Sequence, residues 1–503
     1  MTASRHAAPD QPPVIRARLS LVSRLSAPID SGPLIFFRIL FGLVIVWEVL
    51  RYFSYGWIER YYVQPSLHFT YFGFDWVRPW PTMGMYLHFA VTGAVALCVA
   101  LGLWYRVTSA LLFVLFTYIF LLEQAVYLNH LYLVCLLCFL LIFLPAHREW
   151  SLDVKRRPSL RSITAPAWTL LLLRVQLGIV YVYGGLAKLN ADWVQGEPMR
   201  TWLAKRKNYA VIGPYVTEEW FVAFFTWGGI LLDLLIVPCL LWRPTRWLAL
   251  AGATAFHLTN AMVFRIGIFP WLMLGATALF FPAAWWSRLR RGPGARPATH
   301  GPGRRSARRD ARVDTRELPR TTTGGEHAHE APASPARGVV MVLLGVYFLW
   351  QLLFPLRHFL YPGNVSWTEE GHRFAWHMKL RDKVGQARFV VTDPGTGQQW
   401  RIDPAGYMRR WQLRRMVTHP DMILQFSHYL ADDFRRRGHP DVEVRANVAA
   451  SLNGRRPQPL IDPAVDLTTV RRGLRPADWI VPLYEELRRG QSSETDDAEE
   501  SDD

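Results

Sequence analysis

Polar side chains that can exchange protons or form hydrogen bonds occur at three places within long apolar runs of this sequence. Asn129 and His130 begin one run, and Lys188 ends another. His257 and Asn260 lie within a third. Burial of a lysine amine disfavours its charged form, so a neutral amine becomes available as a general base. Histidine and asparagine side chains can orient a polar group or a developing oxyanion. These residue types favour proton transfer with an apolar ring that carries hydroxyl groups, such as a quinol.

Two glycines, Gly184 and Gly185, come directly before the helix end that carries Lys188. Glycine has no side chain, so a flat molecule could approach the helix backbone closely there. A lysine at the end of an apolar helix also has a simpler role, in which its stem stays in the lipid and its charge reaches water. The residues alone leave a shared site and a snorkelling lysine open.

The runs that contain these residues are long enough to cross a lipid bilayer. Half of the 503 residues are hydrophobic (51%), and about 20 apolar residues span the hydrocarbon layer as a helix. We predict nine spans, at about residues 34–53, 84–103, 107–125, 127–145, 167–187, 220–242, 246–264, 266–284 and 339–359. The sequence therefore predicts a polytopic α-helical membrane protein.

The basic residues indicate an orientation in the membrane. With a cytoplasmic N-terminus, the internal loops are those near Arg106 and at 146–166, 243–246 and 285–338, all of which are basic. Positive loops stay on the cytoplasmic side, so the net charge of +17 is explained without nucleic acid. The outer loop 188–219, which is also basic, is an exception. This orientation puts the three polar groups in the outer half of the membrane and the C-terminal domain outside.

The predicted domains follow from these spans. They are a cytoplasmic segment 1–33, helices one to eight at 34–284, a disordered basic cytoplasmic linker at 285–338, the ninth helix, an extracytoplasmic β-rich or α+β domain at 360–490 and a disordered acidic tail at 491–503. Within the C-terminal domain we expect a hairpin from 388–392 and 399–402, a helix over 421–437 and a strand over 441–452.

Other ionisable residues within the apolar runs have structural explanations. Arg38, Arg174 and Asp233 are expected to form interhelical ion pairs or hydrogen bonds to backbone, because unpaired charges are costly in the membrane. Glu48, near the outer end of the first span, is expected to reach solvent. No metal is expected, since His130 and His257 lack nearby carboxylate or cysteine partners. Cys135 and Cys138, within an apolar helix, are expected to be inert thiols.

The stretch 181–193, YVYGGLAKLNADW, closely resembles the signature of the vitamin K-dependent γ-glutamyl carboxylases. Their bacterial relatives form the horizontally transferred transmembrane (HTTM) family. Other stretches agree in order, namely 38–42, 102–106, Asn129-His130, 256–260, the region of Trp376 and 461–466. The resemblance covers most of residues 30–485.

The resemblance implies an enzyme that oxidises vitamin K hydroquinone, or a menaquinol, to the epoxide with dioxygen. This reaction drives removal of a proton from a peptide glutamate, which then adds carbon dioxide. By matching position, Lys188 would be the base on the hydroquinone, and His130 and Asn129 would orient it. The same resemblance implies that His257, Asn260 and Tyr183 line the cofactor pocket, and that Trp376, Met378 and Arg381 belong to the glutamyl region.

The sequence also departs from this family pattern. It lacks the long C-terminal portion that binds a propeptide in animal carboxylases, and it has no cysteine in its outer regions. Trp376 and Met378 fit the glutamyl region, whereas its neighbouring polar positions are only loosely matched, by His377, Lys379, Arg381 and Lys383. The hydroquinone reaction is therefore better supported than carboxylation of a glutamate-containing peptide. The alternatives are a quinol epoxidase without peptide carboxylation and a non-enzymatic quinone or lipid transporter in the bilayer, although no inverted repeat is visible.

Overall fold

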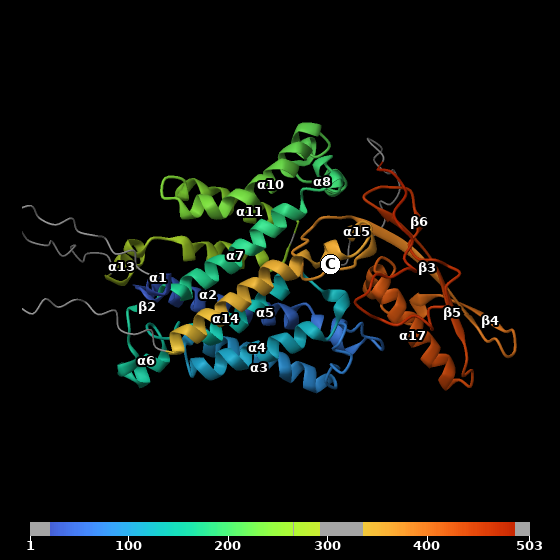
Figure 1. The fold of residues 1–503 in the computed structure, drawn as a ribbon, viewed down its shortest axis with the longest axis horizontal. Coiled ribbons are helices and arrows are strands. Elements are labelled where there is room, and N and C mark those ends of the chain that lie inside the picture. The colour runs from blue at the N-terminus through green and yellow to red at the C-terminus, as the bar shows by residue number, and fades with distance from the viewer. Residues whose placement is uncertain (1–20, 265, 292–334, 488–503) are drawn as a thin grey trace, which may run out of the picture.

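A bundle of long helices makes up most of the protein, and a small sheet domain lies at one end of it (Figure 1). The computed structural model describes residues 21–264, 266–291 and 335–487. The described helices of the bundle are α2 Gly32–Ser54, α3 Thr82–Leu101, α4 Tyr105–Leu121, α5 Asn129–Phe143, α7 Ala167–Ala187, α10 Glu219–Leu241, α11 Arg246–Val263, α12 Phe269–Thr277 and α14 Pro335–Leu353. Each predicted apolar run therefore forms a helix.

The lengths of these helices confirm only part of the predicted topology. Among the described residues, five helices are long and apolar enough to cross a membrane, namely Gly32–Ser54, Thr82–Leu101, Ala167–Ala187, Glu219–Leu241 and Gly338–Leu360. Three further apolar helices, Tyr105–Leu121, Asn129–Phe143 and Phe269–Phe280, are shorter than a full span. The protein is a mostly helical membrane protein, and the count of nine spans is not confirmed.

Two arginines of the bundle, one buried and one half-buried, bind backbone oxygens, as predicted. Arg38 of α2 donates to Ala146 O at 3.1 Å and to Trp150 O at 2.6 Å, and its side chain is fully buried. Arg174 of α7 donates to Leu279 O. The prediction for Glu48 was wrong, because this side chain is buried and its carboxylate pairs with Arg51 at 2.7 Å. A carboxylate one turn before an arginine on the same helix needs no solvent to be compensated.

The basic loops lie at the end of the bundle opposite the sheet domain (Figure 1). They include α6 Leu152–Arg156, α13 Ala283–Arg291 and a short antiparallel pair formed by β1 Pro28–Asp30 and β2 Thr164–Pro166. Helix α13 occupies the first part of the range predicted as a disordered linker, which corrects that boundary. Residues 292–334 of the predicted linker and the predicted acidic tail lie outside the described residues.

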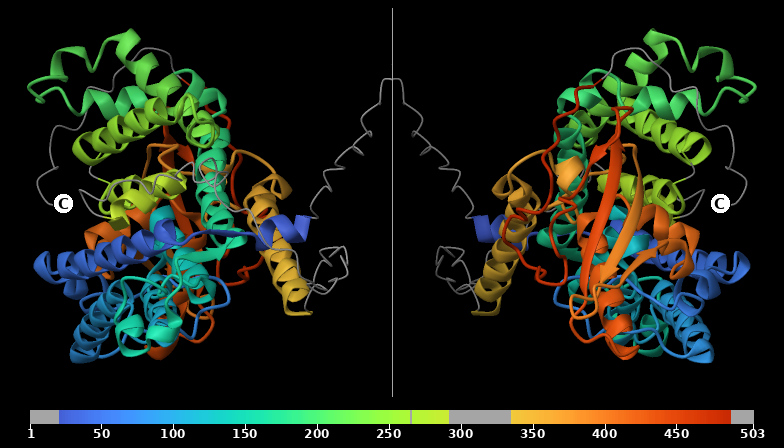
Figure 2. Two further views of the ribbon diagram at one scale, coloured as in Figure 1. Left: turned by 90° about the vertical axis from the view of Figure 1, so that its left-hand side faces the viewer. Right: turned by 90° about the vertical axis from the view of Figure 1, so that its right-hand side faces the viewer.

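The C-terminal domain has an α+β fold around a four-stranded antiparallel sheet with the order β4-β3-β5-β6 (Figure 2). Its elements are β3 Lys383–Thr392, β4 Gln399–Ile402, α16 Arg410–Met416, α17 Pro420–Arg436, β5 Glu443–Leu452 and β6 Gln458–Pro459. The predicted hairpin is confirmed, with Thr392 opposite Gln399. The predicted helix and the predicted long strand are confirmed as α17 and β5. Apolar residues on one side of α17 pack on the sheet and form a separate core.

Loops of the bundle dock into the core of the C-terminal domain. Phe69 and Ala125 belong to loops between bundle helices, yet they are buried among side chains of the C-terminal domain. Beside them, Gln412 of α16 donates to Glu123 Oε2 at 3.1 Å, and Glu123 Oε1 accepts from the backbone of Phe69 and Ala125. Burial raises the pKa of the Glu123 carboxyl to about 8, against the opposing effect of these hydrogen bonds. The two parts of the chain are therefore joined by a buried polar contact as well as by apolar packing.

Candidate functional site

Lys188 lies at the end of α7 and forms a buried ion pair with α10. Its Nζ is 2.6 Å from Asp233 Oδ2 and 3.0 Å from Gly184 O, and both charged side chains are almost fully buried. The interhelical ion pair predicted for Asp233 is therefore confirmed, although the sequence had not identified Lys188 as its partner. The apolar surroundings predicted for Lys188 are corrected, because a carboxylate contacts the amine directly.

The two glycines before Lys188 serve the packing of the protein itself. A Cβ at Gly185 would lie 2.7 Å from Leu234 Cδ2 of α10, so α7 and α10 approach each other closely there. A Cβ at Gly184 would lie 2.9 Å from Met378 Cε and 3.4 Å from Asp233 Oδ2. The space that was predicted for a flat ligand is thus occupied by Met378 of the predicted glutamyl region. This contact brings that region to within one helical turn of Lys188.

A tryptophan supports Lys188 from the other side. Trp193 lies in α8 (Ala191–Val194), which directly follows α7, and its ring centroid is 5.5 Å from Lys188 Nζ. Trp193 is buried, and its indole Nε1 donates to Thr226 O of α10 at 3.2 Å. An aromatic face stabilises a cation. The amine is therefore close to both an aromatic ring and a carboxylate.

The predicted histidines meet around one phenylalanine. Tyr181 OH is 2.8 Å from His257 Nε2, so α7 and α11 are joined by a buried hydrogen bond. The rings of His257 and His130 both contact Phe269 of α12, with centroid distances of 6.0 Å and 5.9 Å. Tyr181 and Lys188 are seven residues apart on the same face of α7, which is about 10 Å along the helix. The hydrogen bond with Tyr181 thus places His257 about two turns from Lys188, and His130 contacts the same phenylalanine as His257.

Asn129 contacts the C-terminal domain. Its Nδ2 donates to His377 O at 3.1 Å, and its Oδ1 accepts from Tyr127 OH at 2.9 Å. The same hydroxyl accepts from Phe374 N at 2.7 Å. Asn129 and Tyr127 therefore fix the segment that carries Trp376 and Met378.

Two predicted pocket residues are placed differently. Tyr183 points away from Lys188, and its hydroxyl donates to Leu352 O of α14. Asn260 lies one turn after His257 on α11 and is only half-buried. Neither residue is joined to the Lys188–Asp233 pair by a hydrogen bond among the described residues.

The predicted residue Arg381 belongs to a second, buried group of charges in the C-terminal domain. We call this group the Glu369 cluster; it consists of Glu369, His372, Arg381, Lys383 and His419. Glu369 Oε2 is 2.5 Å from Arg381 Nη2, and Glu369 Oε1 is 3.7 Å from Lys383 Nζ. His372 and His419 lie 3.7 Å and 3.8 Å from Glu369 Oε2. One carboxylate therefore faces a guanidinium, an amine and two imidazoles.

Burial sets the protonation of the Glu369 cluster. It lowers the pKa of Lys383 to about 7, against the opposing effect of the Glu369 carboxylate. It lowers the pKa of both His372 and His419 well below the ordinary value, and the nearby arginines add to the shift. The histidines are thus neutral at neutral pH, while Lys383 changes charge there.

The segment that joins the two groups has an unusual backbone. Glu369, Phe374, Trp376 and Lys379 all have positive φ angles, between 50° and 65°. Such conformations cost about 1–3 kcal/mol each and concentrate at functional sites. Trp376 is fully buried, and its Nε1 has no hydrogen-bond partner among the described residues. The segment from Glu369 to Lys379, which carries Trp376 and Met378 of the predicted glutamyl region, is therefore strained and tightly packed against the end of the bundle. We call this segment the strap.

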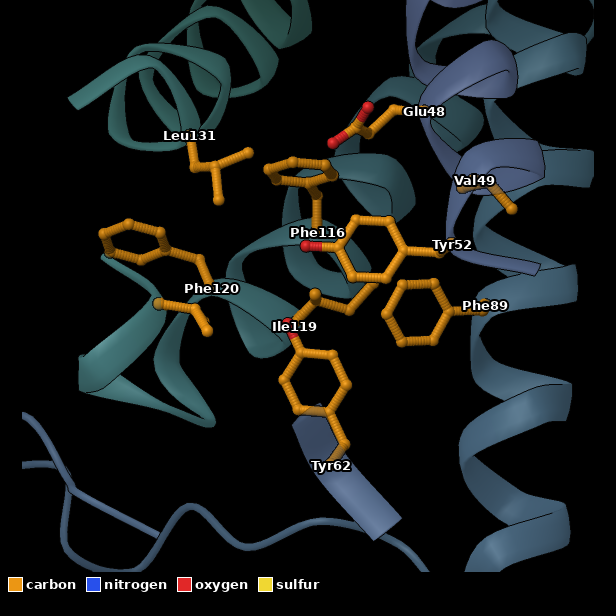
Figure 3. A pocket seen from close by; sticks show the side chains of 10 residues that line it. Glu48, Val49, Tyr52, Tyr62, Phe89, Phe116, Ile119, Phe120 and Leu131 are labelled. Atoms are coloured by element: carbon orange, nitrogen blue, oxygen red, sulfur yellow. The ribbon is translucent and has the colours of Figure 1, made fainter. Parts of the chain in front are cut away.

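A small cavity lies beside these residues but does not include them. It is surrounded by Glu48, Tyr52, Tyr62, Phe89, Phe116 and Leu131, among others, as Figure 3 shows. The tyrosine hydroxyls and the Glu48 carboxylate point toward it. Its volume of about 20 Å³ suffices for about one water molecule, which is far too small for a quinol ring.

Two buried histidine nitrogens lack a hydrogen-bond partner among the described residues. Nδ1 of His257 and Nδ1 of His377 are buried and have no hydrogen-bond partner within the described ranges. Buried polar atoms are normally paired, so such atoms are available to a bound polar group. Among the described residues, no group of three or more His, Cys, Asp or Glu side chains could hold a metal ion.

Sequence reasoning missed the partners of the predicted residues. Asp233 was noted but not joined to Lys188, and Tyr181 and Trp193 were part of the recognised stretch without an assigned role. Glu369 carried no sequence signal, because its partner Arg381 is reached only through folding. The seven-residue spacing of Tyr181 and Lys188, which puts both on one helix face, was the one available signal.

Comparison with known protein families covers nearly the whole described chain. Residues 26–285 match the HTTM domain, which is just over half of the chain. Residues 336–486 match the lumenal domain of vitamin K-dependent gamma-carboxylase. No solved structure matches this chain.

Proposed function

The chain belongs to the vitamin K-dependent gamma-carboxylase family with an HTTM domain, and we propose that it deprotonates vitamin K hydroquinone at the Lys188–Asp233 pair. We further propose that this reaction drives carboxylation of a glutamate-containing peptide. The observation that carries the proposal is the buried pair at the junction of the two domains, in contact with the glutamyl region through Met378.

The pair is suited to accept one proton. Whether the shared proton lies on the amine or on the carboxyl, the pair has no net charge and is stable in an apolar site. In either form it gains one positive charge when it takes up a proton from a quinol hydroxyl. Trp193, with its ring 5.5 Å from Lys188 Nζ, and the carbonyl of Gly184 stabilise the ammonium form. When the shared proton lies on Asp233, Lys188 is a neutral amine and receives the quinol proton, and the protonated carboxyl of Asp233 remains its hydrogen-bond partner.

Other residues of the pocket would hold the ring. We propose that the free Nδ1 atoms of His257 and His377 bind polar groups of the quinol, and that Phe269 packs between His257 and His130 to limit water. We propose that Asn129 positions the strap through its hydrogen bond to His377 O. We also propose that Asn260 and Tyr183 line the cofactor pocket. When bound, vitamin K hydroquinone supplies, together with dioxygen, the base that removes the proton from the glutamyl γ-carbon.

The Glu369 cluster would recognise the glutamyl side chain. While Lys383 is protonated, Arg381 and Lys383 exceed the single carboxylate of the cluster by one positive charge, so an anionic group is attracted. Trp376 and Met378, on the strap between the cluster and Lys188, would direct the γ-carbon toward the quinol. Carbon dioxide would be the second substrate.

The protein is a multi-pass membrane protein whose C-terminal domain is extracytoplasmic, as the lumenal-domain match implies. We propose that the N-terminus is cytoplasmic and that all nine helices cross the membrane. The position of the basic loops at the end opposite the C-terminal domain supports this orientation. A menaquinol shares the ring of vitamin K and is a further candidate cofactor.

One observation favours the narrower function of quinol epoxidation without peptide carboxylation. Arg381 is already paired with the protein's own Glu369 at 2.5 Å, so a substrate carboxylate must compete for it. The same observation gives no support to a transporter.

The proposed function is tested with purified protein in nanodiscs, reduced vitamin K, dioxygen and labelled bicarbonate. Epoxide and fixed label are measured with and without a short glutamyl peptide. We expect both products with the peptide. Epoxide without fixed label at any peptide concentration would show that the protein carries out the quinol reaction but not the carboxylation. Absence of both products, under conditions where a known carboxylase is active, would contradict the proposal.

A further inference from the structure

A buried ion pair joins the segment after Lys188 to the C-terminal domain. Arg455 follows β5, and its Nη1 and Nη2 donate to Asp192 Oδ2 and Oδ1, each at 2.7 Å. Asp192 is four residues after Lys188, and both partners are less than 10% exposed (8% and 9%). Such a two-pronged contact fixes both the distance and the orientation of its partners.

A neighbouring asparagine completes the contact. Asn453 Nδ2 donates to Asp192 Oδ2 at 2.7 Å. Its Oδ1 accepts from Asp382 N at 2.8 Å, directly after Arg381 of the Glu369 cluster. Asn453 has a φ of 51°, a conformation that asparagine tolerates better than most residues. We call Asp192, Asn453 and Arg455 together the Asp192 clamp.

The clamp leads to Lys188 through a short helix. Asp192 lies in α8, where Asn190 Oδ1 accepts from Trp193 N at 3.0 Å. Trp193, the residue after Asp192, carries the ring that supports the Lys188 amine and binds Thr226 of α10. Helix α10 also carries Asp233. A displacement of Asp192 would therefore move the aromatic support and loosen the Lys188–Asp233 pair.

We propose that Arg455 and Asn453 of the C-terminal domain are positioning residues for Lys188. By holding Asp192, they set the place of Trp193 and of the helix end that presents the amine to Asp233. The proposal rests on the function proposed above, because the group that is positioned is the base for the hydroquinone. The C-terminal domain then serves the quinol reaction even when no glutamyl peptide is present.

The activity test compares two arginines that both tie the C-terminal domain to the bundle. Arg455→Gln removes the clamp. Arg472→Lys, the control, alters a contact with Asp75 and Thr70 that does not lead to Lys188. Without peptide, we expect Arg455→Gln to lower kcat for hydroquinone consumption about tenfold to a hundredfold, with KM within about twofold. A displaced base slows proton transfer but leaves ring binding intact, and Arg455→Lys should restore part of the rate.

A second measurement is independent of activity. An amine-specific label, read by mass spectrometry at Lys188, reports how well the clamp buries this side chain. We expect Lys188 to react at least tenfold faster in Arg455→Gln than in the wild type, and at the wild-type rate in Arg472→Lys. Unchanged labelling and unchanged kcat in Arg455→Gln would overturn the positioning role, as would equal changes in both variants. Faster labelling in a protein without hydroquinone activity would support the clamp and contradict the proposed function.

Discussion

The two buried charged groups of this protein differ in net charge. The Lys188–Asp233 pair at the end of the bundle matches one cation with one anion, 2.6 Å apart and almost fully buried. The Glu369 cluster in the C-terminal domain places a single carboxylate against Arg381, Lys383 and two histidines. The first group has no net charge, whereas the second has a surplus of positive charge.

This difference matches two kinds of substrate. A neutral pair in apolar surroundings suits an uncharged ring, which enters from the lipid and loses a proton inside the protein. A cationic cluster suits an anion, because excess positive charge attracts it. The same anion would be unfavourable beside the Lys188–Asp233 pair, because burial of an uncompensated charge in apolar surroundings costs free energy. The strap from Glu369 to Lys379 joins the Lys188–Asp233 pair to the Glu369 cluster. Each substrate can therefore bind at a site of suitable charge while the two substrates stay close to each other.

The largest expected effect concerns the neutral pair. Asp233→Asn removes the carboxyl group that takes up the shared proton, so the Lys188 amine has no neighbouring group to which it can pass its proton before it accepts one from the quinol. We expect hydroquinone consumption to fall about a hundredfold, within the usual range for a general base. Initial rates at saturating hydroquinone measure the effect, and Asp233→Glu, which keeps the charge, should retain more activity. A wild-type rate in Asp233→Asn would mean that the two groups do not differ as proposed.

The next effect concerns the cationic cluster. Arg381→Gln removes the guanidinium that we propose for the glutamyl carboxylate. Hydrogen bonds to charged groups contribute about 1.5–3 kcal/mol, so the KM of the peptide should rise about tenfold to a hundredfold. The KM of the hydroquinone should stay unchanged. If the hydroquinone KM of this variant rises instead, the cluster binds the quinol and not the glutamyl peptide.

A smaller effect should appear with pH. Lys383 has a pKa of about 7 in the folded protein, so it is charged below pH 7 and neutral above it. The cluster therefore loses one positive charge as the pH rises, and the peptide KM should increase several-fold between about pH 6 and pH 8.5. Lys383→Gln should flatten this dependence. A peptide KM that falls with rising pH in the wild type would contradict the assignment.

The smallest effect concerns the junction at Glu123, whose carboxyl has neutral donors as its hydrogen-bond partners. Because its folded pKa is about 8, against an ordinary value of 4.5, the folded state prefers the protonated acid. Its contribution to stability is full below about pH 4.5 and is lost as the pH rises toward 8. Glu123→Gln, which mimics the neutral acid, should raise the thermal midpoint by a few degrees at pH 8.5 but not at pH 5. Equal midpoint changes at both values would exclude this titration.

The sequence predicted the helices well because apolar runs specify them locally. It also predicted the hairpin between β3 and β4 and the helix α17, where turn residues and helix-end signals are strong. The number of full spans could not be fixed in this way. Helices such as α5 Asn129–Phe143 and α12 Phe269–Thr277 end earlier than their apolar runs, because loops and caps set helix ends.

The sequence identified single residues of the candidate site but not the contacts between them. Lys188 and Asp233 were both visible, yet their contact depends on how α7 rotates against α10, which close packing at Gly185 determines. The contact between Asp192 and Arg455 joins residues 263 positions apart, and nothing local specifies it. Long-range partners of charged residues therefore required the fold.

The most direct test of the account measures epoxide and fixed carbon dioxide together in two variants, Lys188→Ala and Arg381→Gln. We expect Lys188→Ala to lose both products, because the quinol reaction precedes carboxylation. We expect Arg381→Gln at low peptide concentration still to form epoxide while fixing little carbon dioxide. Continued epoxide formation by Lys188→Ala would contradict the central claim that the Lys188–Asp233 pair deprotonates the hydroquinone.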